Sequence, residues 1–120
     1  MYSTPHLSGL IFAIKVASWD AERQVSWIER TGFHVDEIAL QIGDLYNAVK
    51  YNIQGEGFPD GVEQGIVDVL TLFDSMSSPG SGLWSVDALF LAAEWDVVRG
   101  KGFFIDWLDE IFFLVTFFRR

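Results

Sequence analysis

Three side chains with oxygen atoms have the types and spacing that favour chemistry in this sequence. Asp44 and Asn47 are three residues apart, so on a helix they project from one side. Asp68 lies in a later segment, four residues after Gln64. Two helices that present Asp44 and Asp68 toward each other would make an oxygen-only site, which suits Mg²⁺ better than a transition metal. The sequence therefore predicts a candidate Mg²⁺ site, and a solvated acidic helix face is the alternative.

The sequence segments that contain and follow these residues also show a recognisable pattern. Residues 37–49 read EIALQIGDLYNAV, residues 61–70 read GVEQGIVDVL, and residues 82–89 read GLWSVDAL. These segments resemble the MazG-like branch of the all-α nucleoside triphosphate pyrophosphohydrolases, and the resemblance covers residues 38–99. The family pattern is Glu-x-x-Glu on one helix and Glu-x-x-Asp on the next. The resemblance implies four acids that bind Mg²⁺, which activates water to cleave a (d)NTP into (d)NMP and pyrophosphate.

The sequence departs from this family pattern at most of its charged positions. The second acid of the pattern falls on Asn47, the third falls on Gly65, and a lysine of the family falls on Ala92. The family asparagine falls on Asp96, which makes Asp96 a candidate third acid from a neighbouring helix. The residues that the resemblance implies are Asp44, Asn47 and Asp68 for catalysis and Asp44, Asp68 and Asp96 for the metal.

Two functions follow from the resemblance, and both stay open. The first is a divergent pyrophosphohydrolase, in which Trp27 or Trp84 would stack on the base of a nucleoside triphosphate or another small nucleotide. The second is a module for nucleotide binding, protein interaction or self-assembly that has lost hydrolysis, which Asn47 and Gly65 favour. A coincidental match between amphipathic helices is a further alternative, and both tryptophans then belong to the core.

The elements that must position these residues are helices separated by segments rich in glycine, proline and serine. We expect loops at residues 55–61, 77–82 and 100–102. Apolar residues recur at helical spacing between the loops, and capping residues precede several segments. The expected helices begin at Pro5 and cover residues 20–30 (or continue the first helix), 35–52, 62–76 (after a capping box of Asp60 and Glu63), 86–98 (capped by Ser85) and 103–118. Gly32 suits the left-handed residue that ends the segment 20–30.

These segments predict one all-α domain over residues 1–120, an antiparallel bundle of four to five helices. The apolar residues of segment 103–118 cover too much of a helix circumference for the surface of a monomer. We therefore expect a homo-oligomer that completes the bundle, although a helix buried within its own chain is the alternative. The expected interface residues are Phe104, Trp107, Ile111 and Phe112.

Composition excludes several classes of partner. The 120 residues are 50% hydrophobic, which favours a folded chain over a disordered one. The formal net charge of -9 repels nucleic acid polymers and anionic membranes. The chain has no cysteine, and its N-terminal segment lacks the pattern of a signal peptide. We therefore expect a cytoplasmic protein that binds neither a nucleic acid polymer nor a membrane.

Overall fold

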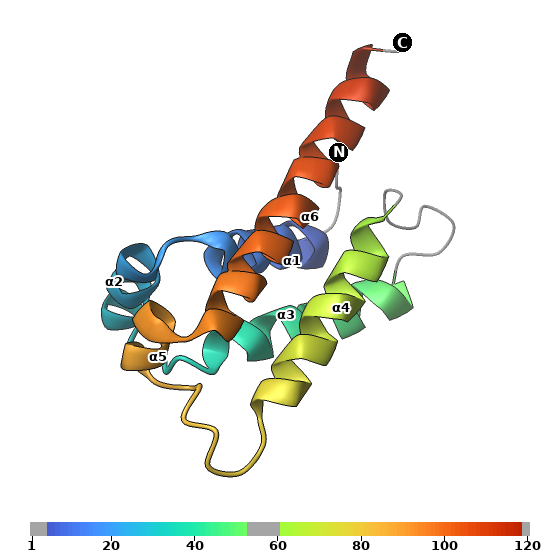
Figure 1. The fold of residues 1–120 in the computed structure, drawn as a ribbon. Helices are drawn as coiled ribbons and strands as arrows, with labels where there is room; N and C mark the ends of the chain where they lie inside the picture. The colour runs from blue at the N-terminus through green and yellow to red at the C-terminus, as the bar shows by residue number, and fades with distance from the viewer. Residues whose placement is uncertain (1–4, 53–60, 119–120) are drawn as a thin grey trace.

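The computed structural model describes residues 5–52 and 61–118, and it describes the side chains of residues 8–50 and 61–107. Within these ranges the chain forms six helices and no strand, which confirms the all-α class (Figure 1). The sequence predicted four to five helices, but the first two are separate and the chain breaks again at Ala92. The helices are α1 (Pro5–Ser18), α2 (Ala21–Thr31), α3 (Glu37–Asn52), α4 (Val62–Met76), α5 (Val86–Leu91) and α6 (Ala93–Phe118).

Local sequence signals determine several helix ends. Asp20 caps α2, because its carboxylate accepts a hydrogen bond from the backbone N–H of Arg23 at 2.9 Å. Gly32 ends α2 with a φ of 74°, a left-handed conformation that glycine adopts without strain. Ser85 caps α5 by accepting a hydrogen bond from the N–H of Ala88 at 3.1 Å. The predicted roles of Gly32 and Ser85 are therefore confirmed.

Helices α3 and α4 pack through the apolar stripes that their sequences predict. The hydroxyl of Tyr46 joins the two helices by donating to Oε2 of Glu63 at 2.8 Å. The sequence predicted a capping box for Glu63 with Asp60, but Asp60 lies outside the described residues and Glu63 makes this contact between helices. The buried positions are Ile38, Ile42, Tyr46 and Val49 on α3 and Val62, Ile66, Val69, Phe73 and Met76 on α4.

The C-terminal third of the chain differs from the prediction of a helix over residues 86–98 followed by a loop. The chain instead breaks at Ala92, which is extended with φ -84° and ψ 131°. The break precedes Trp95, whose fully buried indole donates a hydrogen bond to the carbonyl of Leu83 at 2.7 Å. Helix α6 then runs unbroken through Gly100 and Gly102, so the loop predicted at residues 100–102 is wrong.

Packing against α1 explains why α6 keeps a glycine at position 102. A Cβ atom on Gly102 would lie 3.3 Å from the carbonyl oxygen of Ile14 and from two atoms of Ser18. Glycine costs a helix about 1 kcal/mol relative to alanine, and close packing of helices compensates for such a cost. One helical turn further along α6, Oδ1 of Asp106 lies 3.3 Å from Nζ of Lys15. Helices α1 and α6 are therefore held together by close backbone contact and an ion pair.

The guanidinium of Arg99 connects α6 to three other parts of the fold. Its Nε donates to the carbonyl of Trp19 at 3.1 Å, and one terminal nitrogen pairs with Asp96 at 3.1 Å. The other terminal nitrogen donates to Oε1 of Gln24 at 2.9 Å and to the carbonyl of Leu89. Gln24 is fully buried, and its amide nitrogen donates to two carbonyls of α1 at 3.0 and 3.2 Å. This network joins the α1–α2 junction, α5 and α6.

Helix α6 also extends beyond the other helices. Its N-terminal half lies beside α4 and runs antiparallel to it, whereas its C-terminal half projects away from the body of the fold (Figure 1). The principal dimensions of the chain, 49 × 25 × 25 Å, reflect this projection. None of the helices that the structure describes has both the length and the apolar character needed to cross a membrane.

The hydrogen bonds of Arg99 predict that replacing this residue lowers the stability of the fold strongly. Arg99→Ala should lower the free energy of unfolding by about 2–4 kcal/mol, because it leaves Gln24 and two carbonyls without their donor. Urea denaturation followed by far-UV circular dichroism measures the change. Arg30→Ala is the matched control and should change stability by less than about 0.5 kcal/mol, since Arg30 is exposed. Equal stabilities of the two variants would contradict the structural role of Arg99.

Candidate functional site

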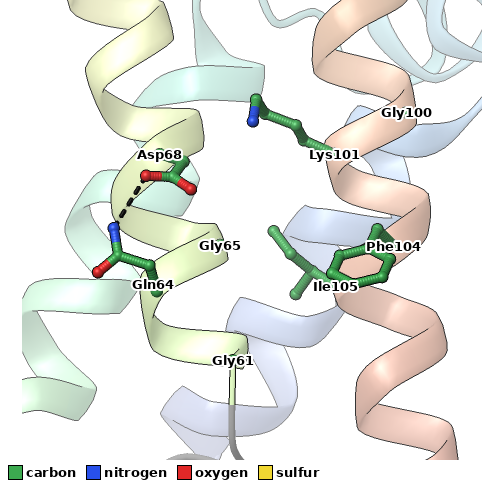
Figure 2. Close-up of a pocket in the computed structure, with 8 residues that line it drawn as sticks. All are labelled: Gly61, Gln64, Gly65, Asp68, Gly100, Lys101, Phe104 and Ile105. Carbon is green, nitrogen blue, oxygen red and sulfur yellow. Dashed lines mark hydrogen bonds between the residues drawn. The ribbon is translucent and has the colours of Figure 1, made fainter.

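A cavity of about 430 Å³ lies between α4 and α6 (Figure 2). The two helices are antiparallel here, so residues 61–68 of one wall face residues 100–105 of the other. The volume falls within the range of about 300–1,000 Å³ that is typical of small-molecule sites. Its walls are Gly61, which precedes α4, with Gln64, Gly65 and Asp68 on α4, and Gly100, Lys101, Phe104 and Ile105 on α6.

Charged groups of opposite sign lie at one end of this cavity. Asp68 is on the α4 wall, where its Oδ1 accepts a hydrogen bond from Nε2 of Gln64 at 2.9 Å. Lys101 is on the α6 wall, and its amine extends across the cavity toward α4 (Figure 2). Lys101 makes no hydrogen bond or ion pair with the residues that the structure describes. The polar end therefore offers an ammonium group, a carboxylate and an amide to a ligand.

Glycine residues shape the rest of the cavity. A Cβ atom on Gly65 would lie 2.7 Å from Cγ1 of Ile105, so any larger residue at this position requires the buried isoleucine to move. This includes the glutamate that the resemblance would place at position 65. Gly100, in contrast, has no heavy atom within 4 Å of its virtual Cβ, which marks open space. Packing against Ile105 therefore favours glycine at position 65.

The structure brings only one of the predicted catalytic or metal-binding residues into this cavity. Asp68 lines it, whereas Asp44, Asn47 and Asp96 are not among its lining residues. Asp44 and Asn47 are exposed on α3. Asp96 is exposed near the start of α6 and pairs with Arg99 at 3.1 Å. Its carboxylate therefore already has a cationic partner.

The predicted Mg²⁺ site is not assembled as the four-acid pattern implies. Among the described side chains, those of residues 8–50 and 61–107, no three His, Cys, Asp or Glu converge as a potential metal site. Mg²⁺ can be held by one or two carboxylates when phosphate oxygens and waters complete its shell. Mg²⁺ binding therefore stays a prediction, and of its predicted ligands Asp68 lines the cavity between α4 and α6.

The two tryptophans predicted to stack on a base both pack within the fold. Trp27 is only 7% exposed and meets the ring of Phe33 edge to face at 5.5 Å. Trp84 is half-buried and packs against Phe73 and Trp95, with ring centroids 5.7 and 5.6 Å apart. Trp84 also borders a second cavity of about 460 Å³ between α3 and α4, so part of its ring stays accessible.

The cavity contains functional groups that the sequence did not single out. The sequence predicts a loop around Lys101 and assigns no functional role to Gln64. A signal for them existed, because Gly61 and Gly65 are four residues apart, as are Gln64 and Asp68. On a helix, this spacing places the two glycines, which have no side chain, beside the two polar residues. The sequence does not predict the part of α6 that faces these residues, because the glycines on both sides of Lys101 indicate a loop.

Comparisons of the chain with protein-family models, with curated proteins and with solved structures found no match. The MazG-like resemblance of residues 38–99 therefore stays a prediction. The all-α fold agrees with it only at the level of fold class. Function must be argued from the cavity and the exposed surfaces.

The contact between Gly65 and Ile105 predicts that two similar substitutions have different effects. Gly65→Ala and Gly100→Ala both remove a glycine from a helix interior, so both gain up to about 1 kcal/mol of helix propensity. Gly65→Ala should nevertheless be less stable than Gly100→Ala by about 1–3 kcal/mol, because its Cβ overlaps the buried isoleucine. Thermal and urea denaturation of the two variants measure this difference.

A double-mutant cycle tests the cause of that difference. In an Ile105→Ala background, the cost of Gly65→Ala should fall, because the overlapping Cγ1 is gone. A cost that stays unchanged in this background would show that another contact opposes a side chain at position 65.

Proposed function

We propose that this chain is a helical self-assembly module, in which α6 docks on a second copy of the chain. One observation carries the proposal. Three adjacent aromatic side chains of α6, Phe103, Phe104 and Trp107, are 67%, 54% and 47% exposed. We call these three residues the aromatic face. Contiguous aromatic surface of this kind on a folded chain is typical of an interaction site.

The aromatic face has the geometry of a preformed contact surface. The rings of Phe104 and Trp107 stack with centroids 5.9 Å apart and planes inclined by 25°. Large aromatic side chains bury roughly 150–250 Å² each and dominate interface energetics. Aromatic side chains have few rotatable bonds, so fixing them in an interface costs little conformational entropy. Trp107 is the expected centre of the contact, because tryptophan is enriched among the residues that contribute most to binding.

A second copy is the partner that fits this surface best. The aromatic face lies on the exposed side of the turn of α6 that buries Ile105, and apolar residues continue along the sequence at 108, 111, 112, 115 and 118. The side chains of Ile111 and Phe112, two predicted interface residues, lie outside the described side chains. The same helix on a second copy offers an equally apolar surface, and a two-fold axis pairs identical patches in a closed assembly.

Charge supports the proposal in the described stretch of α6. Each copy carries a formal net charge of -9, so an interface must avoid placing unpaired carboxylates together. Asp106 lies within the aromatic stretch, but its carboxylate turns toward Lys15 of α1 and is only 20% exposed. The aromatic face therefore has no exposed unpaired acid between residues 103 and 107.

Nucleotide hydrolysis is the second candidate, and the position of Asp68 opposite Lys101 favours it. The ammonium group of Lys101 could supply the phosphate contact that is lost at Ala92. The absence of a charged side chain at Gly65 weighs against catalysis, because the family chemistry depends on several acids. The assembly module therefore has the stronger support.

The self-assembly proposal predicts a concentration-dependent dimer. Sedimentation equilibrium should show association of the wild-type chain at or below about 100 μM, and Trp107→Gln and Phe103→Gln should each weaken it at least about tenfold. Leu91→Gln is the matched control, because Leu91 is 84% exposed on α5 and lies outside the aromatic face. A monomeric wild-type chain, or equal weakening by Leu91→Gln, would contradict the proposal.

The competing hydrolase function has a direct assay. We expect no pyrophosphate release above an enzyme-free blank when the chain is incubated with Mg²⁺ and a panel of ribo- and deoxyribonucleoside triphosphates. The reason is that Asp68 is the only predicted acid that lines the cavity. Turnover by the wild-type chain that disappears in Asp68→Asn would establish hydrolysis and overturn this expectation.

A further inference from the structure

We propose that the cavity between α4 and α6 binds a small zwitterion, an α-amino acid with an apolar side chain. The inference is independent of the self-assembly function. It rests on the position of Lys101 opposite Asp68 at one end of the cavity and on the apolar character of the other end (Figure 2).

The charges at the polar end match a zwitterion better than an ion of either sign. Lys101 and Asp68 contribute one positive and one negative charge on opposite walls. An anion held by Lys101 would lie near the carboxylate of Asp68 and in the field of a chain with net charge -9. A cation held by Asp68 would instead be repelled by Lys101. A ligand with both charges avoids both penalties.

Both protein groups have hydrogen-bonding capacity left for such a ligand. An ammonium group has three donors, and Lys101 uses none of them on the residues that the structure describes. A carboxylate has about four acceptor sites, and the hydrogen bond from Gln64 occupies one of those on Asp68. The ligand carboxylate therefore pairs with Lys101, and the ligand ammonium pairs with Asp68. Such charge-assisted hydrogen bonds are stronger than neutral ones.

The apolar end begins one helical turn from these charges. Ile105 is 1% exposed and packs against the bare backbone of Gly65, which forms the floor. The ring of Phe104 forms a wall beside it. An α-amino acid carries its side chain on the atom next to both charged groups, so a branched or aromatic side chain reaches this end. Free glycine and acidic amino acids lack such a side chain and should bind more weakly.

Calorimetric titration of the full chain with L-phenylalanine and L-leucine tests the proposal. We expect saturable binding with a dissociation constant of about 1 mM or lower, as for a small polar site with few contacts. The matched probes are 3-phenylpropanoate, which lacks the ammonium group, and 2-phenylethylamine, which lacks the carboxylate. Each should bind at least about tenfold more weakly than L-phenylalanine. No binding of either amino acid overturns the proposal, as does equal binding of one analogue.

Variants then place the ligand in this cavity. Lys101→Met and Asp68→Asn should each weaken L-phenylalanine binding at least about tenfold. Gly100→Leu should abolish it by filling the cavity, and its Cβ meets no heavy atom within 4 Å, so the helical circular dichroism signal should persist. Gly43→Ala on α3 is the control, because its Cβ makes only an ordinary contact of 3.8 Å with Leu70 and lies outside the cavity. Full binding by Gly100→Leu overturns the proposal.

Two further measurements separate this site from the other functions. Phe104 belongs to both the cavity and the aromatic face, so the titration is repeated on Phe103→Gln, which weakens only assembly. Binding that survives in Phe103→Gln supports a site within one chain. Binding lost in Phe103→Gln but kept in Gly100→Leu would place the ligand at the interface and overturn the proposal. A Mg²⁺-dependent preference for nucleoside triphosphates over amino acids would overturn it as well.

Discussion

The close approach of α6 to α1 and α4 is the constraint on which the rest of the structure depends. Two glycines permit it: Gly102 lies against the backbone of α1, and Gly65 lies against Ile105. A side chain at either position would push the helices apart, because the atoms that it would meet belong to backbone or to a buried residue. Arg99 adds directional hydrogen bonds to this packing and joins α6 to the junction of α1 and α2.

This placement of α6 creates the features that suggest function. Alongside α4, the bare backbone at Gly65 and Gly100 leaves a cavity with Asp68 and Lys101 across its polar end. On its exposed side, the same stretch of α6 presents the aromatic face. Packing also opposes any side chain at position 65, since Ile105 occupies the space beside it. The arrangement supports binding and assembly more strongly than hydrolysis.

The candidate site was only partly predictable. Asp68 was identified because an aspartate at a helical position, within a motif-like segment, has a readable local pattern. Lys101 was missed, because Gly100 and Gly102 are individually unfavourable in helices and indicated a loop. Their helical state depends on packing against α1, which no local window contains. Asp68 lines the cavity between α4 and α6 and Asp44 does not, because residue spacing describes a single helix and not the orientation of its neighbour.

By itself, the sequence determined the all-α class, the boundaries of α3 and α4 within a few residues, and the caps at Gly32 and Ser85. These features follow from interactions within about one helical turn, so periodicity and capping residues are sufficient to read them. Only the tertiary structure decided the break at Ala92, the unbroken course of α6 and the position of Asp68 opposite Lys101 in a cavity. Those features depend on contacts between residues far apart in the chain, where packing overrides local propensity.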